Sequence, residues 1–336
     1  MVNQMIDVHT HVVPPEIPFG LSGSYPWQSL DRSGEEAWLC RGGRKTRAVK
    51  PGGYSLAERL DDMREAGVEI QVLSMMPALL NYEAPADEAA HFCSRTNEWI
   101  ADQVASGLGK LVGLGVVPMQ EPDAATQMLG EVSAAGLRGV EIGSSVAGVP
   151  LCDARYRSFF AEAARLDLAL FVHAGQGRAP LGITWETAAA ATSLPNEIGA
   201  ALAGLIIEGI VRDFPRLRIC ASHGAGSLVM ILPRLDRTWR SDHRPVDRRD
   251  LHLMDVLPET PSAYARRMWV DCLVFAPAAF RHLEQTYGTS QIVVGSDYPF
   301  GPDLPGLILD QVGSLPSDML EQVTFRNARR FLGLPD

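Results

Sequence analysis

Short apolar segments rich in β-branched residues recur eight times along the 336 residues, and segments with helical periodicity separate them. The predicted strands are residues 5–11, 69–77, 111–118, 139–145, 168–175, 217–224, 268–274 and 292–300. A helix is predicted over 55–67, where Ser55 and Glu58 match a capping box and Gly67 marks the end. Eight alternations of strand and helix are typical of a ring of parallel strands surrounded by helices. We therefore predict an α/β fold, a (β/α)8 TIM-type barrel.

Two segments do not fit this repeat. Residues 12–54 are rich in proline and glycine and are too long for a simple connection. We expect them to form a small insertion over the barrel mouth, after the first strand. Residues 241–262 form a second long connection. Since a barrel of this kind accommodates such a length, we expect residues 1–336 to form a single domain.

The composition narrows the range of partners. The formal net charge is -10, and the one basic cluster, residues 41–47, is short, which argues against binding to nucleic acid. Small molecules are the expected partners. The five cysteines are widely spaced and contain no CxxC pair, which predicts reduced thiols and a cytoplasmic location. Neither a secretion signal nor a bilayer-spanning apolar run is recognisable, so no membrane association is expected.

Five polar residues fall at the carboxyl ends of predicted strands. His9 and His11 are two residues apart on the first strand, so their side chains are expected to face the same side. His173, His223 and Asp297 end the fifth, sixth and eighth strands. A lone buried histidine is more often a hydrogen-bonded core residue, but here several converge on one end of one barrel. Three nitrogen ligands and one carboxylate suit Zn²⁺ or a similar divalent ion, with a position left open for water.

The neighbouring residues suggest supporting roles. His223 has the chemistry for proton transfer beside an ion, although a role as a fifth ligand or as a support stays open. Residues 224–226, Gly-Ala-Gly, would let the backbone approach a ligand closely. Asp7 is expected to act as a hydrogen-bonded strut that orients a ligand. Glu141 and Asp271, near the ends of the fourth and seventh strands, are further candidates for support and are assigned no catalytic role.

The start Asp7-x-His9-x-His11 and the motifs FVHAG, ASHGAGS and GSDYPFG resemble the amidohydrolase superfamily. The resemblance is to its branch of metal-dependent decarboxylases, and most of all to the 2-amino-3-carboxymuconate-6-semialdehyde decarboxylase family. It extends over nearly the whole chain. It implies an α/β barrel with a single zinc ion held by His9, His11, His173 and Asp297, and no organic cofactor.

The same resemblance assigns further residues. It implies that His223 and Asp297 are catalytic, that Arg47 and Arg234 bind the substrate carboxylate, and that Phe300 lines the pocket. A guanidinium group can hold a carboxylate with two parallel hydrogen bonds. Without the resemblance, both arginines would be taken for solvated surface residues. Because the second arginine of that family reaches the site of the neighbouring subunit, a homodimer is implied.

The chain departs from that family after the metal histidine of the fifth strand. Where the family has Pro-Trp, this sequence has Ala174 and Gly175, followed by Gln176, Gly177 and Arg178. The change removes a flat stacking surface, opens volume and adds a cation. We therefore expect a different substrate even if the reaction type is retained.

Three hypotheses for the function follow. The leading one is a zinc-dependent decarboxylase of a small unsaturated or aromatic carboxylate. The alternative is a metal-dependent hydrolase of a lactone, amide or related carbonyl compound, because the same activated water can attack a carbonyl group. The third is a binding protein without catalysis, which the complete ligand set disfavours.

Overall fold

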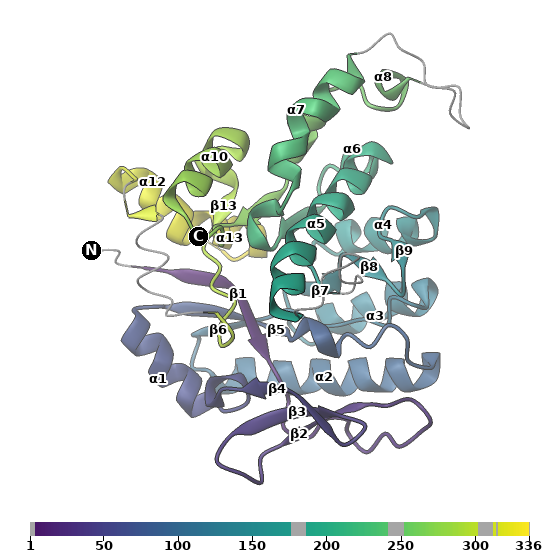
Figure 1. Ribbon diagram of the computed structural model, residues 1–336, viewed down its shortest axis with the longest axis vertical. Helices are drawn as coiled ribbons and strands as arrows, with labels where there is room; N and C mark the ends of the chain where they lie inside the picture. Colours follow the sequence, from purple (N-terminus) through teal and green to yellow (C-terminus); the bar gives the residue numbers. More distant parts are fainter. Residues whose placement is uncertain (1–3, 176–185, 241–251, 302–311, 314, 336) are drawn as a thin grey trace.

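The computed structural model describes residues 4–175, 186–240, 252–301, 312–313 and 315–335. Its eight parallel strands form two sheets (Figure 1). The first sheet has the order β1 (Ile6–Val12), β5 (Ile70–Met75) and β6 (Leu111–Gly113). The second has the order β13 (Ile292–Val293), β12 (Trp269–Asp271), β11 (Arg218–Ala221), β10 (Ala169–His173) and β7 (Gly139–Gly143). Seven of the predicted segments contain one of these strands each, and the first, 5–11, contains all of β1 except Val12.

Isolated parallel bridges join the two sheets at both edges. Asp7 of β1 pairs with Val294, directly after β13, and Gly115, shortly after β6, pairs with Val140 of β7. The eight strands therefore follow one another around a ring in chain order. The predicted α/β barrel is confirmed.

Helices follow the strands and surround them (Figure 1). They include α1 (Leu56–Ala66), α2 (Ala86–Ser106), α3 (Pro122–Ala134), α4 (Arg157–Arg165), α5 (Glu186–Ile207), α6 (Ile210–Asp213), α7 (Leu228–Trp239), α10 (Pro277–Tyr287), α12 (Ser317–Glu321) and α13 (Asn327–Leu332). The predicted helix corresponds to α1: the Ser55 hydroxyl accepts a hydrogen bond from the Glu58 N–H, and Gly67 ends the helix in the left-handed conformation. Over the described ranges, no helix combines the length and the apolar character needed to cross a membrane.

The segment between β1 and α1 contains a separate antiparallel sheet. Its strands are β2 (Gln28–Asp31), β3 (Ala37–Arg41) and β4 (Arg44–Val49), in that order. Figure 1 shows this sheet beyond the carboxyl end of β1. The expectation that residues 12–54 are an insertion over the mouth of a single-domain barrel stays a prediction.

The second long connection is described only in part. Residues 241–251 lie outside the described ranges. The remainder contains α8 (Leu253–Val256) and leads into α9 (Pro261–Ala265).

Candidate metal centre

Four side chains predicted from the sequence meet at the carboxyl ends of the strands. One ligand atom from each of His9, His11, His173 and Asp297 lies within 4.8 Å of the others. Nε2 of His9 lies 3.2 Å from Nε2 of His11 and 2.9 Å from Nε2 of His173. Oδ1 of Asp297 lies 3.1 Å from Nε2 of His11. The three histidines are buried, and the Asp297 side chain is 26% exposed. We call these four residues the metal cluster.

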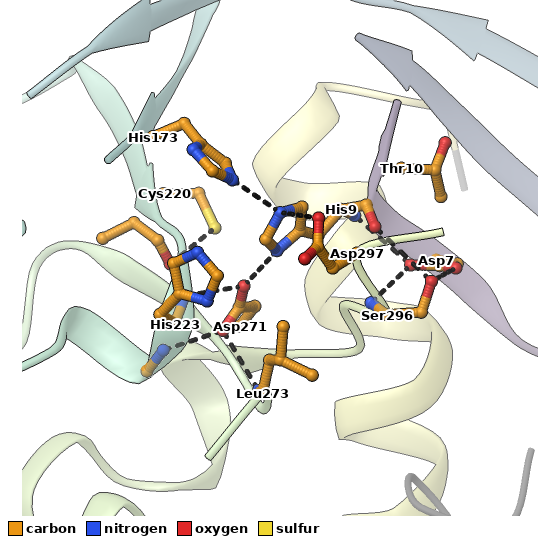
Figure 2. A network of polar contacts seen from close by, with 12 residues as sticks. Asp7, His9, Thr10, His173, Cys220, His223, Asp271, Leu273, Ser296 and Asp297 are labelled. Carbon is orange, nitrogen blue, oxygen red and sulfur yellow. Dashed lines mark hydrogen bonds and ion pairs between the residues drawn. The ribbon is translucent and has the colours of Figure 1, made fainter. Parts of the chain in front are cut away.

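The hydrogen bonds of the histidine rings test whether a cation fits. Nδ1 of His9 lies 2.6 Å from the Asp271 carboxylate (Figure 2). Nδ1 of His173 lies 2.6 Å from the Ala174 carbonyl oxygen. Because both partners are acceptors, these Nδ1 atoms carry protons and the Nε2 atoms face the position of an ion. Ligand atoms about 2 Å from a tetrahedral ion lie about 3.4 Å apart, close to the separations found here. The residues therefore fit a divalent ion.

The local electrostatics favour the protonation states that ligands need. Burial lowers the pKa of His11 to about 4 and the pKa of His173 well below its usual value. Burial would raise the pKa of Asp297, but the hydrogen bond with His11 and the charge of His9 outweigh it, so that pKa lies well below the usual range. At neutral pH this leaves two neutral imidazoles and one carboxylate, the forms that bind metal ions.

His9 differs from the other two histidines. Burial lowers its pKa, but the hydrogen bond and charge of Asp271, together with the charge of Asp297, outweigh this and raise the pKa to about 9. An ion bound at neutral pH would therefore displace one proton from His9.

Asp7 connects the first strand to the loop that follows the last strand. Its carboxylate accepts hydrogen bonds from the N–H groups of His9, at 3.3 Å, and Ser296, at 3.1 Å. The N–H of Asp297 in turn donates to the His9 carbonyl oxygen at 2.8 Å. Asp297 itself has a positive φ of 59°. Asp7 is thus the hydrogen-bonded strut expected from its position, and it holds two members of the cluster side by side.

His223 lies against the cluster without belonging to the four. Its ring centroid is 5.3 Å from that of His9 and 5.1 Å from that of His173. Its Nε2 atom is buried and has no hydrogen-bond partner in the described part of the chain. Burial lowers the pKa of His223, and the charge of His9 lowers it further. A neutral imidazole with an unpartnered ring nitrogen thus lies beside the metal cluster.

Asp271 orients both His9 and the loop that carries His223 (Figure 2). Besides holding His9 Nδ1, its carboxylate accepts hydrogen bonds from the backbone N–H groups of His223, at 2.9 Å, and Gly224, at 2.8 Å. These two residues have positive φ values of 53° and 58°. A non-glycine residue in this conformation is strained, and the two bonds to Asp271 offset that strain.

The loop after His223 has no room for larger residues. A Cβ atom on Gly226 would lie 2.1 Å from the Pro195 carbonyl oxygen in α5, and one on Gly224 would lie 2.3 Å from Cγ1 of Val274. The two glycines therefore let the loop pack directly on its neighbours, and the expected close approach of this backbone to a ligand stays a prediction.

The predicted substrate-binding residues fall into two groups. Arg47 on β4 places its guanidinium carbon 4.6 Å from the Phe300 ring centroid, and the Phe300 ring lies 6.2 Å from the His11 ring. These two residues are therefore brought to the cluster. Arg234 is exposed on α7, and no described contact connects it to the cluster of its own chain. Arg178 lies outside the described residues.

One buried supporting residue was not anticipated. Arg59 of α1 is 2% exposed and donates to the His11 carbonyl oxygen at 2.5 Å and to the Thr10 hydroxyl at 3.0 Å. A signal was present in the sequence, because Arg59 interrupts the apolar face that includes Leu56 and Met63.

Glu141, which was predicted only as a possible supporting residue, lies beside His11 of the metal cluster. Its carboxylate is buried without a hydrogen-bond partner among the described residues, 3.8 Å from the likewise unpartnered Nδ1 of His11. Burial raises the pKa of Glu141 to about 8. Its carboxylate thus faces Nδ1 of His11, on the opposite side of the ring from Asp297.

Two cavities lie beside these residues. The larger, about 750 Å³, includes His223 and Asp297 in its wall and is otherwise lined mainly by apolar side chains. The smaller, about 360 Å³, is lined by polar residues such as Arg41 and Asn81 and reaches Gly175, two residues beyond His173.

Comparisons with known proteins agree with this geometry. A family model described as amidohydrolase matches residues 6–334. A 2-amino-3-carboxymuconate-6-semialdehyde decarboxylase of Dictyostelium discoideum is 30% identical over 98% of this chain and 91% of its own length. Among solved structures, IDCase of Metarhizium anisopliae has a TM-score of 0.81 at 20% identity, covering 99% of this chain and 98% of the other.

A further solved structure, the 5-carboxyvanillate decarboxylase of Novosphingobium aromaticivorans, contains manganese and 4-hydroxy-3-methoxy-5-nitrobenzoic acid. It has a TM-score of 0.78 at 19% identity, covering 98% of this chain and 96% of the other. The motifs, the barrel and the matched family model lead to one conclusion. The chain is an enzyme of the amidohydrolase family, in its branch of metal-dependent decarboxylases.

Proposed function

We propose that this enzyme releases CO₂ from a small unsaturated or aromatic carboxylate, at a site formed by the metal cluster, His223 and Arg47. The observation that carries the proposal is the unpartnered Nε2 of His223 beside three histidines and an aspartate. A divalent ion bound there would supply a Lewis acid that makes a water molecule acidic near neutral pH.

The remaining steps are assigned to side chains of the enzyme. His223, neutral because its pKa is lowered, receives a proton and passes it to the carbon that bears the carboxylate. The bond between that carbon and the carboxylate then breaks, its electron pair returns to the substrate, and CO₂ leaves. Arg47 holds the carboxylate until this step, and Phe300, which packs under the Arg47 guanidinium, flanks the substrate.

We propose zinc as the ion and no organic cofactor. Three imidazole nitrogens and one carboxylate form a donor set that zinc prefers, although the manganese in one related structure indicates that such sites accept other divalent ions. Metal analysis of the protein purified without added metal, followed by reloading with zinc or manganese, tests this assignment.

We also propose a cytoplasmic homodimer in which Arg234 enters the site of the second copy. Its exposure on α7 and its lack of contact with its own cluster are compatible with this role. Mixing Arg234→Ala chains with His223→Ala chains should restore activity, to about half of the sites in each hybrid dimer. A mixture of Arg47→Ala with His223→Ala should stay inactive. No recovery, with subunit exchange confirmed by mass, would contradict the dimer as drawn.

The reaction itself is tested with metal-loaded protein. The substrates are a panel of hydroxybenzoates and carboxylated ring-cleavage products, and released CO₂ is measured. We expect CO₂ from at least one acid, and none from the same acid after chelation of the metal. Hydrolysis of lactones or amides without any CO₂ release would favour the alternative, a metal-dependent hydrolase.

A further inference from the structure

The larger cavity begins at the site of the proposed chemistry and extends away from it. His223 and Asp297 form part of its wall. The rest comes from the carboxyl-terminal side of the barrel: α5, α7, the loop after β12, and α10. Apolar side chains in this wall include Leu194, Val229, Leu273, Val274, Phe275 and Leu283.

The charges in the wall indicate which end of a substrate could lie there. Among the described residues that line the cavity, none is a lysine or an arginine, Asp297 is the one acid, and His282 is the one histidine besides His223. A carboxylate would lose its hydration in this cavity without gaining a lysine or arginine partner. Arg47 lies on the other side of the cluster, so the favoured orientation directs the substrate carboxylate toward Arg47 and the opposite, uncharged end into the cavity.

The wall presents apolar surface that a ligand could cover. Phe275 is 57% exposed. Phe275 also has a positive φ of 58°, which is unusual for a bulky side chain. The loop that carries it is held by Asp271, whose carboxylate accepts the Leu273 N–H at 3.1 Å. One residue thus fixes both the cluster histidine His9 and the apolar wall.

We propose that this cavity is a subsite for an apolar group, and that the preferred substrates are aromatic carboxylates bearing an alkyl chain or a second ring opposite the carboxylate. This inference rests on the proposed decarboxylase function and specifies its substrate class. A volume of about 750 Å³ is in the range of sites that enclose drug-sized ligands, and is far more than one hydroxylated ring fills. Burying the extra apolar group stabilises the bound acid because each methylene leaves water.

The experiment compares 2,6-dihydroxybenzoate with its 4-pentyl derivative on the metal-loaded enzyme. We expect kcat/KM for the pentyl acid to be on the order of 10- to 100-fold higher, from the burial of about two to three methylenes. Ala279→Phe places a ring in the cavity from α10 and should abolish this advantage, because it lowers kcat/KM for the pentyl acid much more than for the short acid. Val229→Ser, which makes the wall polar without filling it, should reduce the advantage severalfold.

Ala124→Phe is the matched control. It makes the same change at a half-buried position of α3, a helix that contributes no residue to the described cavity wall, and should keep the advantage. Equal kcat/KM for the two acids, with Ala279→Phe affecting both alike, would overturn the subsite and leave the decarboxylase function standing.

If CO₂ is released from neither acid, binding measurements test the apolar subsite separately from the decarboxylase function. Calorimetric titration of both acids into the metal-loaded protein then decides the subsite independently of the reaction. Tighter binding of the pentyl acid that is lost in Ala279→Phe supports the subsite although the proposed reaction has failed. Equal affinities overturn the subsite as well.

Discussion

The two sides of the barrel mouth are built differently. The histidine side, at the ends of β1, β5, β7 and β10, carries His11 and His173 at positions paired with neighbouring strands, and His9 at the register shift of β1 between Asp7 and Thr10. The apolar side, at the ends of β11, β12 and β13, carries His223 and Asp297 in loops where both have positive φ. The first side fixes two of its three histidines through strand register, and the second places its groups through strained loops.

The cavities differ in the same way. On the histidine side, the polar groups of the smaller cavity already bond to one another: the Tyr25 hydroxyl donates to Asn81 at 3.1 Å, and Arg41 donates to Tyr25 at 3.3 Å. On the apolar side, the larger cavity is continuous with His223 and Asp297. The smaller cavity contains an arginine, but its polar groups already form hydrogen bonds with one another. It is therefore not favoured over the larger cavity as the substrate site. The histidine side thus carries three of the four residues of the metal cluster, and we propose that the apolar side receives the uncharged end of the substrate.

The largest expected effect is loss of the ion from the histidine side. His173→Ala removes a ligand from a buried site and should lower metal content well below one ion per chain and reduce turnover by about 10⁴-fold or more. Metal analysis and CO₂ release measure the two effects. A His9→Ala/His11→Ala double mutant that keeps one ion per chain would show that the cluster is not the metal site.

On the apolar side, His223→Ala should separate chemistry from metal binding. We expect the metal content to stay near that of the wild type while the rate falls by about 10²- to 10⁴-fold, the usual contribution of a general acid–base group. If the ion is lost together with the activity, His223 is a ligand, and the division between the two sides is wrong.

Glu141→Leu sharpens the description of the histidine side. Removing the acid nearest to Nδ1 of His11 should weaken metal affinity by about 10- to 100-fold, as loss of a supporting partner does. It should also raise the stability of the metal-free protein by about 1–3 kcal/mol, because a buried polar group without a hydrogen bond is removed.

Chelator competition and denaturant unfolding measure these opposite changes. Glu141→Gln, which keeps an oxygen acceptor for Nδ1, serves as the conservative control and should retain most of the affinity. Unchanged metal affinity in Glu141→Leu would remove Glu141 from the support of His11.

The smallest expected effect compares the two cavities directly. Val229→Asp brings a carboxylate to the apolar cavity and should lower kcat/KM for an aromatic acid by about tenfold, since the charge must stay hydrated. Arg41→Ala in the smaller cavity should change kcat/KM by less than about twofold, as for groups outside the binding site. A larger loss of kcat/KM in Arg41→Ala than in Val229→Asp would show that the substrate binds in the smaller cavity, on the histidine side.

The sequence predicted the histidine side well because its information is local. Two histidines two residues apart on a strand share a face, and strand ends meet at one edge of a barrel, so His9, His11 and His173 could be placed together before the structure was known. The α1 helix was equally predictable, since Ser55 and Gly67 signal its ends.

What the sequence could not provide depends on contacts between distant segments. The pairing of β1 with β5 shifts register between Asp7 and Thr10, an irregularity that no residue pattern announced. The bond between Asp271 and His9 spans 262 positions, so its geometry depends on the closed ring. The larger cavity needs the relative placement of α5, α7 and α10, which periodicity within each helix does not determine.

The bridge between Asp7 and Val294 has a consequence for how the protein is made. It joins the first strand of the barrel to the end of the last strand. His9 and Asp297, the two predicted ligands beside it, lie near opposite ends of the sequence and are therefore synthesised at different times. At typical rates of translation, roughly 15–60 s separate their appearance. During that interval the nascent chain carries histidines that can bind a metal ion but no complete set of ligands. The finished set exists only when the ring has closed.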